Sequence, residues 1–279
     1  MDYLEIKAPA KINFGLNIIS KRDDGYHNIK TIFYPLNDLY DVIKFSKSDK
    51  LIFTCNENEL VNNRNLIIKA KDILEKEAKI KFNVKIELIK KIPVGAGLGG
   101  GSSDAAATLL SLNEMFSLKF DIETLKKFAM QLGSDVPFFI NPKPSFAAGR
   151  GEKITLIDFE INLPVLIVNP GIHISTKEAY RNIIPKKPAF DLKNISEINF
   201  SDIEFLKQIT NDFEEYVFKT YPKVYQIKEK LYQYGSKFAL MTGSGSTVFG
   251  IFENVETAKK VKKSFPLGYF TFISCSANQ

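Results

Sequence analysis

The sequence predicts an α+β protein built from two lobes. Its 279 residues are enough for two domains, each with a buried core. Hydrophobic residues make up 44% of the chain and charged residues 25%, proportions that are typical of a globular protein. The pattern of strands and helices starts afresh beyond residue 155. We therefore predict a first lobe over residues 1–155 and a smaller α+β lobe over residues 156–279.

The first eighty residues contain strand-like runs joined by polar turns. The predicted strands are Tyr3–Ile6, Lys11–Ile19, Lys30–Tyr34 and Asp41–Phe45. One helical face follows, made of Leu66, Ile67, Ala70, Ile73 and Leu74. Residues 82–89 then alternate apolar and polar side chains, which indicates a half-exposed, antiparallel strand.

Two helices complete the predicted first lobe. One spans residues 104–116, and the next has Asp121 as its N-cap and Gly133 as its end. The apolar face of the second helix is Ile122, Leu125, Phe128, Ala129 and Leu132. In the second lobe we predict a buried strand over 164–168, helices over 176–183, 202–216, 222–234 and 256–264, two strands flanking the glycine turn of KFALMTGSGSTVFGIF, and a last strand.

A formal net charge of +6 and a pI near 9.0 raise the question of nucleic-acid binding. Only four of the 38 basic residues are arginine, the side chain best suited to phosphate and base recognition. The lysines are interleaved with Glu and Asp, as on an ordinary solvated surface. We therefore predict no nucleic-acid partner, although the positive charge helps to attract an anionic substrate.

Three further features bear on location and partners. The longest apolar run, residues 163–168, is too short to cross a membrane, so we expect no membrane partner. Asp2 and Glu5 lie where a secretory signal would be basic. Cys55 and Cys275 lack metal-ligand spacing and are too few for a disulfide framework. These features predict a cytoplasmic protein with reduced thiols.

The stretch PVGAGLGGGSSDAAA, residues 93–107, raises the question of a phosphate-binding loop. The P-loop pattern fails because no lysine follows these glycines. Gly95-x-Gly97-x-x-Gly100 matches the dinucleotide pattern, but the strand before it alternates instead of being fully buried. A flexible linker would not end in Ser and Asp residues suited to capping the helix that follows. We interpret the stretch as an anion cradle made of backbone N–H groups and a helix N-terminus.

Three segments of the chain resemble the motifs of the GHMP kinases. They are KAPAKINFGLNIISKRDDGYHNI, PVGAGLGGGSSDAAATLL and TGSGSTVFGIF. PAKIN, RDDGYH and GSDVPFF are similar to the group within that superfamily whose acceptor is a cytidine diphosphate ester of methylerythritol. The resemblance covers about residues 7–252. It implies the two-lobed GHMP kinase fold, with a nucleotide-binding lobe like ribosomal protein S5 and a smaller ferredoxin-like lobe. It also implies ATP-dependent phosphorylation of the acceptor's 2-hydroxyl in the non-mevalonate isoprenoid pathway.

The same resemblance implies that Asp135 is the catalytic base and Lys11 its partner. Taken alone, Asp135 would be interpreted as a helix N-cap and Lys11 as a surface lysine. A lysine beside an aspartate lowers the carboxyl pKa below its usual value of about 3.9. We therefore expect Asp135 to act mainly by orienting the acceptor hydroxyl, while Lys11 stabilises negative charge.

The resemblance also implies the binding residues. For ATP they are Pro93, Val94, Gly95, Ala96, Gly97, Leu98, Gly99, Gly100, Gly101, Ser102, Ser103 and Asn65. For the acceptor they are Asn13, Tyr26, His27, Thr176 and Tyr180, with Gly243, Ser244 and Gly245 as a supporting loop. An aromatic ring suits the face of cytosine, and an imidazole suits its edge. His173 is predicted to be structural.

The predicted cofactors are ATP and Mg²⁺, with the Ser102 or Ser103 hydroxyl as a candidate metal contact. The predicted partners are small-molecule substrates, and either a monomer or a homodimer fits the sequence. Three alternatives stay open. The chain could be another GHMP kinase acting on homoserine, mevalonate or a sugar, or a nucleotide-binding regulator without catalysis. TGSGST, residues 242–247, could be a simple hairpin turn.

Overall fold

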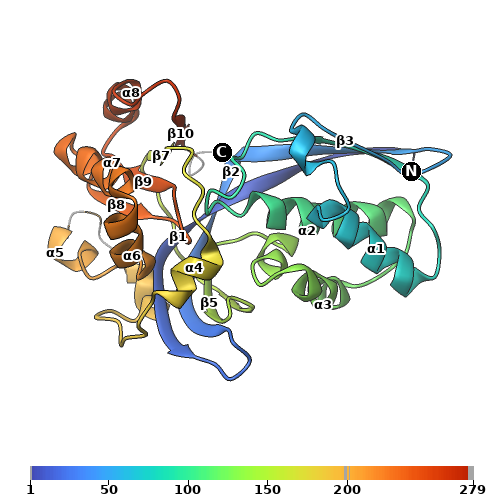
Figure 1. The fold of residues 1–279 in the computed structure, drawn as a ribbon, viewed down its shortest axis with the longest axis horizontal. Coiled ribbons are helices and arrows are strands. Elements are labelled where there is room, and N and C mark those ends of the chain that lie inside the picture. Colours follow the sequence, from blue (N-terminus) through green and yellow to red (C-terminus); the bar gives the residue numbers. More distant parts are fainter. Residues whose placement is uncertain (1, 198–199, 201, 276–279) are drawn as a thin grey trace. The chain divides into compact units, whose positions relative to one another are not determined.

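The computed structural model describes residues 2–197, 200 and 202–275, and Figure 1 shows their fold. The chain divides into two compact units, and neither is continuous in sequence. The first unit contains Met1–Ala10, Leu39–Val94 and Gly99–Pro142, and the second contains Lys11–Asp38, Gly95–Leu98 and Lys143–Gln279. The glycine-rich segment, which we define as residues 93–103, therefore contributes residues to both units.

Two long strands, β1 (Tyr3–Lys21) and β2 (His27–Lys47), replace the four short strands predicted from the sequence. Ala8 and Ala10, which lie between the first two predicted strands, are fully buried within β1, so the strand continues through them. The predicted polar turn between the strands is confirmed. It is closed by a hydrogen bond of 2.8 Å from Arg22 N to Tyr26 O, with Gly25 at φ +82°.

The first unit combines a sheet with three helices. The strand β4 (Val84–Ile89) pairs antiparallel with the later part of β2 and parallel with β3 (Ile52–Cys55). Its alternation is confirmed, because Val84, Ile86 and Leu88 are buried and Lys85 is exposed. The helices α1 (Leu66–Ala78), α2 (Gly100–Met115) and α3 (Ile122–Leu132) pack on one another along this sheet (Figure 1). Short helical turns, η1 (Asn58–Leu60) and η2 (Val136–Ile140), complete the unit.

The predicted ends of α3 are confirmed and the predicted start of α2 is wrong. The Asp121 side chain accepts a hydrogen bond from Thr124 N at 2.8 Å, and Gly133 is the C-cap of α3. Ile122, assigned to the apolar face, is 47% exposed. The helix α2 begins at Gly100 instead of Asp104, because Gly99 at φ +75° serves as the N-cap. The predicted capping residues Ser102, Ser103 and Asp104 therefore lie inside α2.

The second unit is built around an antiparallel sheet with the order β10-β7-β9-β8. Its strands are β7 (Val165–Asn169), β8 (Phe238–Met241), β9 (Val248–Ile251) and β10 (Phe270–Ser274). The helices α6 (Phe213–Thr220), α7 (Pro222–Gln233) and α8 (Val255–Lys263) bury apolar side chains in the same core, among them Val217, Leu231 and Val261. The strands β5 (Ser145–Gly149) and β6 (Lys153–Leu156) extend the early part of β2. The smaller helices are α4 (Thr176–Arg181), η3 (Leu192–Glu197) and α5 (Ile203–Leu206).

The single helix predicted over residues 202–216 is wrong. Two helices, α5 and α6, occupy this region, and the segment between them contains turns and an isolated β-bridge from Asn211 to Leu16. Leu16 of β1 explains the break, because its N–H donates to Thr210 O at 2.8 Å and its carbonyl accepts from Asp212 N at 2.9 Å. A backbone that pairs with a strand cannot at the same time form helical hydrogen bonds. The other predicted helices and strands are confirmed to within a few residues.

No helix among the described residues is long and apolar enough to cross a membrane.

Candidate active site

The glycine-rich segment alternates between anchored side chains and bare backbone. Gly95, Gly97 and Gly99 have φ values of +66°, +78° and +75°, a region that L-amino acids rarely adopt. Between them, Ala96 and Leu98 are 4% and 1% exposed. The two buried side chains hold the segment in place, and the glycines allow its backbone to turn and to approach other groups closely.

The helix α2 begins within this segment, at Gly100. The first N–H groups of a helix have no partner within the helix, and the aligned peptide dipoles make this end positive. Ser102, in the first turn, is half-buried, whereas Ser103 is 1% exposed. The Ser103 hydroxyl is buried without a hydrogen-bond partner among the described residues. Of the two predicted serines, Ser102 is therefore the one with an accessible side chain, and the helix end suits an anion.

The turn TGSGST, residues 242–247, joins β8 to β9 and also packs against Gly97. A Cβ atom on Gly97 would lie 2.3 Å from the Thr242 carbonyl oxygen. In addition, the Thr242 hydroxyl lies 3.2 Å from the Gly97 carbonyl oxygen. The hairpin turn and the glycine-rich segment thus meet backbone to backbone.

Lys11 is a buried lysine, 3% exposed, and not the surface lysine that its sequence position alone would suggest. Its Nζ donates to Asn13 Oδ1 at 2.5 Å and to the Gly97 carbonyl at 3.1 Å, and it lies 5.3 Å from the centre of the Phe33 ring. Its backbone N–H donates to Leu98 O at 2.9 Å. The ammonium group is thereby tied to the backbone of the glycine-rich segment.

Asn13 holds the Lys11 ammonium in position. Its Oδ1 accepts from Lys11, its Nδ2 donates to Thr31 Oγ1 at 2.8 Å, and its backbone N–H donates to Thr242 Oγ1 at 2.9 Å. The Thr31 hydroxyl in turn donates to the Gly15 carbonyl at 2.6 Å. A side chain with this many partners, 2% exposed, has one orientation, and so does the lysine that it binds.

Two asparagines that the sequence did not single out support the TGSGST turn. Asn211 Nδ2 donates to Met241 O at 2.7 Å and to Gly243 O at 2.8 Å. Asn169 Nδ2 donates to Thr247 Oγ1 at 2.9 Å. Asn169, at the end of a predicted strand before Pro-Gly, carried a weak turn signal. Asn211 carried none, because it falls in the region interpreted as a helix.

Two of the predicted acceptor residues contact each other in the second unit, and Tyr26 lies apart from them. His27 and Tyr180 stack, with ring centres 4.9 Å apart and planes 20° apart, and Phe213 meets Tyr180 edge-on at 4.8 Å. Tyr26 lies outside this stack. It is 51% exposed, and the Arg150 guanidinium lies 4.4 Å from its ring centre. Burial, with a smaller contribution from Lys21, lowers the pKa of His27 below the usual imidazole value.

Thr176 and the supporting loop are in contact. The Thr176 hydroxyl lies 2.8 Å from the Ser244 hydroxyl. His173 differs from the structural role predicted for it, because it is exposed and its Nδ1 lies 3.2 Å from the position of a Cβ on Gly95. His173 therefore borders the glycine-rich segment.

Asp135 and Asn65 belong to the first unit. Asp135 is half-buried at the N-cap position of η2, but its side chain makes no capping hydrogen bond. Asp135 therefore occupies the N-cap position without capping the helix through its side chain. Asn65 is a cap, because its Oδ1 accepts from Ile67 N at 2.9 Å and its Nδ2 donates to Leu60 O at 3.0 Å.

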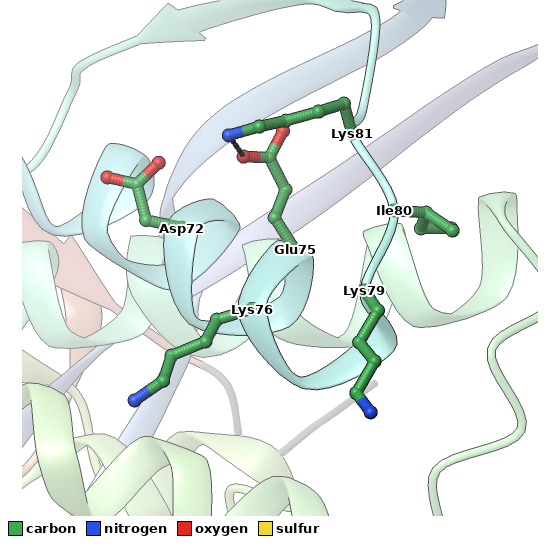
Figure 2. A pocket seen from close by; sticks show the side chains of 6 residues that line it. All are labelled: Asp72, Glu75, Lys76, Lys79, Ile80 and Lys81. Carbon is green, nitrogen blue, oxygen red and sulfur yellow. Dashed lines mark hydrogen bonds and ion pairs between the residues drawn. The ribbon is translucent and has the colours of Figure 1, made fainter.

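A surface hollow of about 410 Å³ lies at the C-terminal end of α1 (Figure 2). Its lining consists of Asp72, Glu75, Lys76, Lys79, Ile80 and Lys81. Lys81 Nζ pairs with Glu75 Oε2 at 3.0 Å, so these two charges in the lining of the hollow neutralise each other (Figure 2). None of the predicted site residues lines it, and it takes no part in the candidate active site.

Two family models match the chain. The model of the GHMP kinases N terminal domain matches residues 65–142, and that of the GHMP kinases C terminal matches residues 189–269. A 4-diphosphocytidyl-2-C-methyl-D-erythritol kinase from Chlorobium phaeobacteroides (strain BS1) is 44% identical over 273 residues, which cover 95% of this chain and 94% of that protein. The chain belongs to this family of GHMP kinases.

Further members of the kinase family agree with this assignment. The 4-diphosphocytidyl-2-C-methyl-D-erythritol kinase of Prosthecochloris aestuarii (strain DSM 271 / SK 413) is 43% identical, with 96% of each chain covered. A crystal structure of 4-(cytidine 5'-diphospho)-2C-methyl-D-erythritol kinase matches with a TM-score of 0.84 and 30% identity, covering 97% of this chain and 98% of that one. Homoserine kinase from Cytophaga hutchinsonii shares the fold, with a TM-score of 0.72 and 18% identity. The predicted two-lobed GHMP kinase fold is confirmed.

Proposed function

We infer that this chain transfers the γ-phosphoryl group of ATP to the 2-hydroxyl of 4-diphosphocytidyl-2-C-methyl-D-erythritol, in the non-mevalonate isoprenoid pathway. The observation that carries this function is the 44% identity with a kinase of that name along almost the whole of both chains. Full-length similarity of this kind includes both halves of the protein, and the geometry described above supplies groups suited to each part of the reaction.

ATP binding is supported by the glycine-rich segment and the N-terminus of α2. Exposed backbone at Gly95 and the positive end of a helix of 16 residues suit the triphosphate. We propose residues 93–103 as the phosphate-binding loop. We keep Asn65 as a candidate contact of the adenosine, although part of its amide is used as the cap of α1.

Mg²⁺ fits the same loop. This ion is usually held by one or two carboxylates together with phosphate oxygens. Of the two candidate serines, Ser102 has the accessible hydroxyl that would contact the ion. Bound Mg²⁺ would neutralise charge on the phosphoryl group.

In the proposed reaction, the 2-hydroxyl oxygen bonds to the γ-phosphorus as the bond to the bridging oxygen of ADP breaks. Asp135 orients the hydroxyl and receives its proton, which then passes to water. Lys11 stabilises the negative charge that spreads over the phosphoryl oxygens. The bonds from Lys11 to Asn13 and Gly97 fix the position of this charge before the substrates arrive.

Recognition of the acceptor is assigned to Asn13, Tyr26, His27, Thr176 and Tyr180. His27 and Tyr180 already form a stack on which a cytosine can extend, and the exposed face of Tyr26 offers a second ring. Asn13 acts through its hold on Lys11. Gly243, Ser244 and Gly245 brace the site, since Ser244 contacts Thr176.

We also propose that residues 1–155 form the ATP-binding domain and residues 156–279 the substrate-side domain. The two family models match on either side of residue 155. We propose in addition that the enzyme works in the cytoplasm on small molecules alone, without nucleic acid, as a monomer or a homodimer.

Transfer of labelled phosphate from ATP tests the function. We expect turnover with 4-diphosphocytidyl-2-C-methyl-D-erythritol, and rates at least about 100-fold lower with homoserine and mevalonate, which lack the nucleobase that the site recognises. Transfer only to homoserine or mevalonate would assign the chain to another branch of the superfamily. Binding of ATP with no transfer to any acceptor would favour a regulator.

The role of His27 predicts a pH dependence. Because burial lowers the pKa of His27 below the usual imidazole value, the imidazole is neutral at pH 7 and becomes charged only in more acidic solution than a free imidazole does. A protonated imidazole loses the lone pair that accepts a hydrogen bond. We expect KM for the acceptor to rise roughly three- to tenfold between pH 7 and pH 5, and KM for ATP to rise less.

His27→Gln is the matched variant, because it keeps a donor and an acceptor and does not titrate in this range. Its acceptor KM should start higher, since the stack on Tyr180 is lost, and should then be flat across the same pH range. An equal pH slope in wild type and variant would exclude His27 as the titrating group.

A further inference from the structure

A buried ionic triad lies at the base of the glycine-rich segment. Lys90 Nζ is 2.5 Å from Asp41 Oδ2 and 2.9 Å from Asp104 Oδ2. The three side chains are between 0% and 4% exposed. They come from β2, from the residue after β4 and from α2, and all three belong to the first unit.

The triad holds both ends of the segment. Lys90 lies three positions before Pro93, the first residue of the segment. Asp104 directly follows Ser103, the last residue of the segment. The other oxygen of Asp41, Oδ1, accepts from Lys91 N at 2.6 Å and from Ile92 N at 2.9 Å. The residues just before and just after the segment are therefore held by the same three charged side chains.

Gly100 makes room for this arrangement. A Cβ atom on Gly100 would lie 3.0 Å from Lys90 Nζ and 3.1 Å from Ile92 Cγ2. The backbone of Gly100 is helical, so a positive φ does not explain the glycine. The neighbouring Gly101 meets nothing closer than 3.9 Å. The glycine at position 100 is thus matched to the Lys90 ammonium and to the Ile92 side chain.

Burying these three charged side chains costs folding free energy. Two carboxylates and one ammonium leave a buried negative charge, and Asp104 Oδ1 has no hydrogen-bond partner among the described residues. Burial raises the pKa of Asp104 to about 7, Lys90 opposes this shift, and Asp41 adds to it. Apolar side chains in such a site often give the protein equal or greater stability. The role of a buried ionic group is then to specify one arrangement of the surrounding backbone.

We propose that Lys90, Asp41 and Asp104 form a clasp that closes the base of the glycine-rich segment and holds it in the shape that binds the nucleotide. The proposal rests on the proposed function in one respect, namely that the ligand of the segment is ATP. The three side chains are positioning residues. They act through the backbone of residues 91–92 and the first turn of α2, and they do not touch the substrate.

The first test compares two nearly isosteric variants of Asp104 by calorimetric titration with ATP and Mg²⁺. Asp104→Asn keeps an acceptor for Lys90, whereas Asp104→Leu removes it. We expect Asp104→Leu to raise Kd for ATP about tenfold or more, with KM for the acceptor within about twofold of wild type, and Asp104→Asn to stay within about threefold for both. Equal effects of the two variants, or an unchanged Kd in Asp104→Leu, would overturn the clasp.

Lys71→Met is the control for loss of a buried ion pair elsewhere in the first unit. Lys71 Nζ lies 2.9 Å from Glu75 Oε2 on α1, with side chains 5% and 7% exposed. This substitution should lower the thermal unfolding midpoint and leave Kd for ATP within about twofold of wild type. If Lys71→Met weakened ATP binding as much as Asp104→Leu does, the effect would be one of general stability and the clasp would be rejected.

A second measurement needs no nucleotide. Hydrogen–deuterium exchange of residues 93–103 should be faster in Gly100→Ala, which pushes on the Lys90 ammonium while all three charges remain, than in Gly101→Ala or wild type. Equal exchange in the two alanine variants would overturn the clasp even if Asp104→Leu failed to fold. Failure of the wild type to bind ATP would instead contradict the proposed function, and the exchange data would still decide whether the clasp holds the segment.

Discussion

Replacement of Asp135 by asparagine should lower kcat by roughly 10²–10⁴-fold, or about 3–5 kcal/mol in activation free energy, while Kd for ATP changes by no more than about threefold. Asparagine has nearly the same shape but cannot take the hydroxyl proton, and it orients the hydroxyl less strongly. Steady-state kinetics with both substrates, together with titration of ATP alone, measure the two quantities. A loss of only a few-fold in kcat would remove Asp135 from catalysis.

Asp121 provides the matched control for Asp135, because both are N-cap aspartates in the first unit. The Asp121 carboxylate caps α3 through Thr124 N, whereas the Asp135 side chain makes no capping bond. Asp121→Ala should therefore lower the thermal unfolding midpoint and leave kcat unchanged. Asp135→Asn should do the reverse. If both variants lost stability and activity in parallel, the loss at Asp135 would be a folding effect.

Replacement of Gly97 by alanine should lower kcat/KM by about 100-fold or more. The new Cβ would lie 2.3 Å from the Thr242 carbonyl oxygen and 3.3 Å from that of Gly245, so one backbone must move. Any movement of Gly97 displaces the carbonyl that binds the Lys11 ammonium. A displacement of about 1 Å in a catalytic group can reduce the rate about 100-fold. The measurement is kcat/KM for each substrate, with circular dichroism to confirm folding.

Gly235→Ala separates the clash from the backbone strain. Gly235 follows α7 with φ +87°, close to the φ of +78° at Gly97, and a Cβ there meets nothing within 4 Å. Alanine at either position therefore carries a similar strain, of about 1 kcal/mol or more. We expect Gly235→Ala to lose some stability and to keep its activity. Activity within a few-fold of wild type in Gly97→Ala would contradict the close packing of the two turns.

Local patterns in the sequence were sufficient for most helices and strands. The alternation in β4 and the Asp121 cap of α3 involve residues a few positions apart, and both were predicted correctly. The start of α2 was misplaced, because Gly99 in a left-handed conformation can cap a helix as the serines can. The break before α6 could not be predicted, since it depends on pairing with Leu16, a residue almost two hundred positions earlier in the chain.

In the candidate site, too, local motifs were predicted and contacts between distant residues were not. The motifs pointed to Lys11, Asp135 and the glycine-rich segment, and the placement of Lys11 against Gly97 agrees with that assignment. Three features depend on contacts that no local pattern indicates: the asparagine bonds to the TGSGST turn, the stack of His27 on Tyr180, and the triad of Lys90. Each joins side chains from segments that are far apart in the sequence, and hydrophobic periodicity contains no information about such pairs.

The sequence by itself determined the family, the fold class and the chemical character of the glycine-rich segment. These follow from motifs of consecutive residues and from local periodicity. The tertiary structure alone decided which groups surround the segment. Asn13 meets Thr242 across 229 positions, and Lys90 meets Asp104 across the segment itself. The physical reason is that a buried charge or amide is stabilised by whichever partners the packed core brings within about 3 Å, and the path of the whole chain determines those partners.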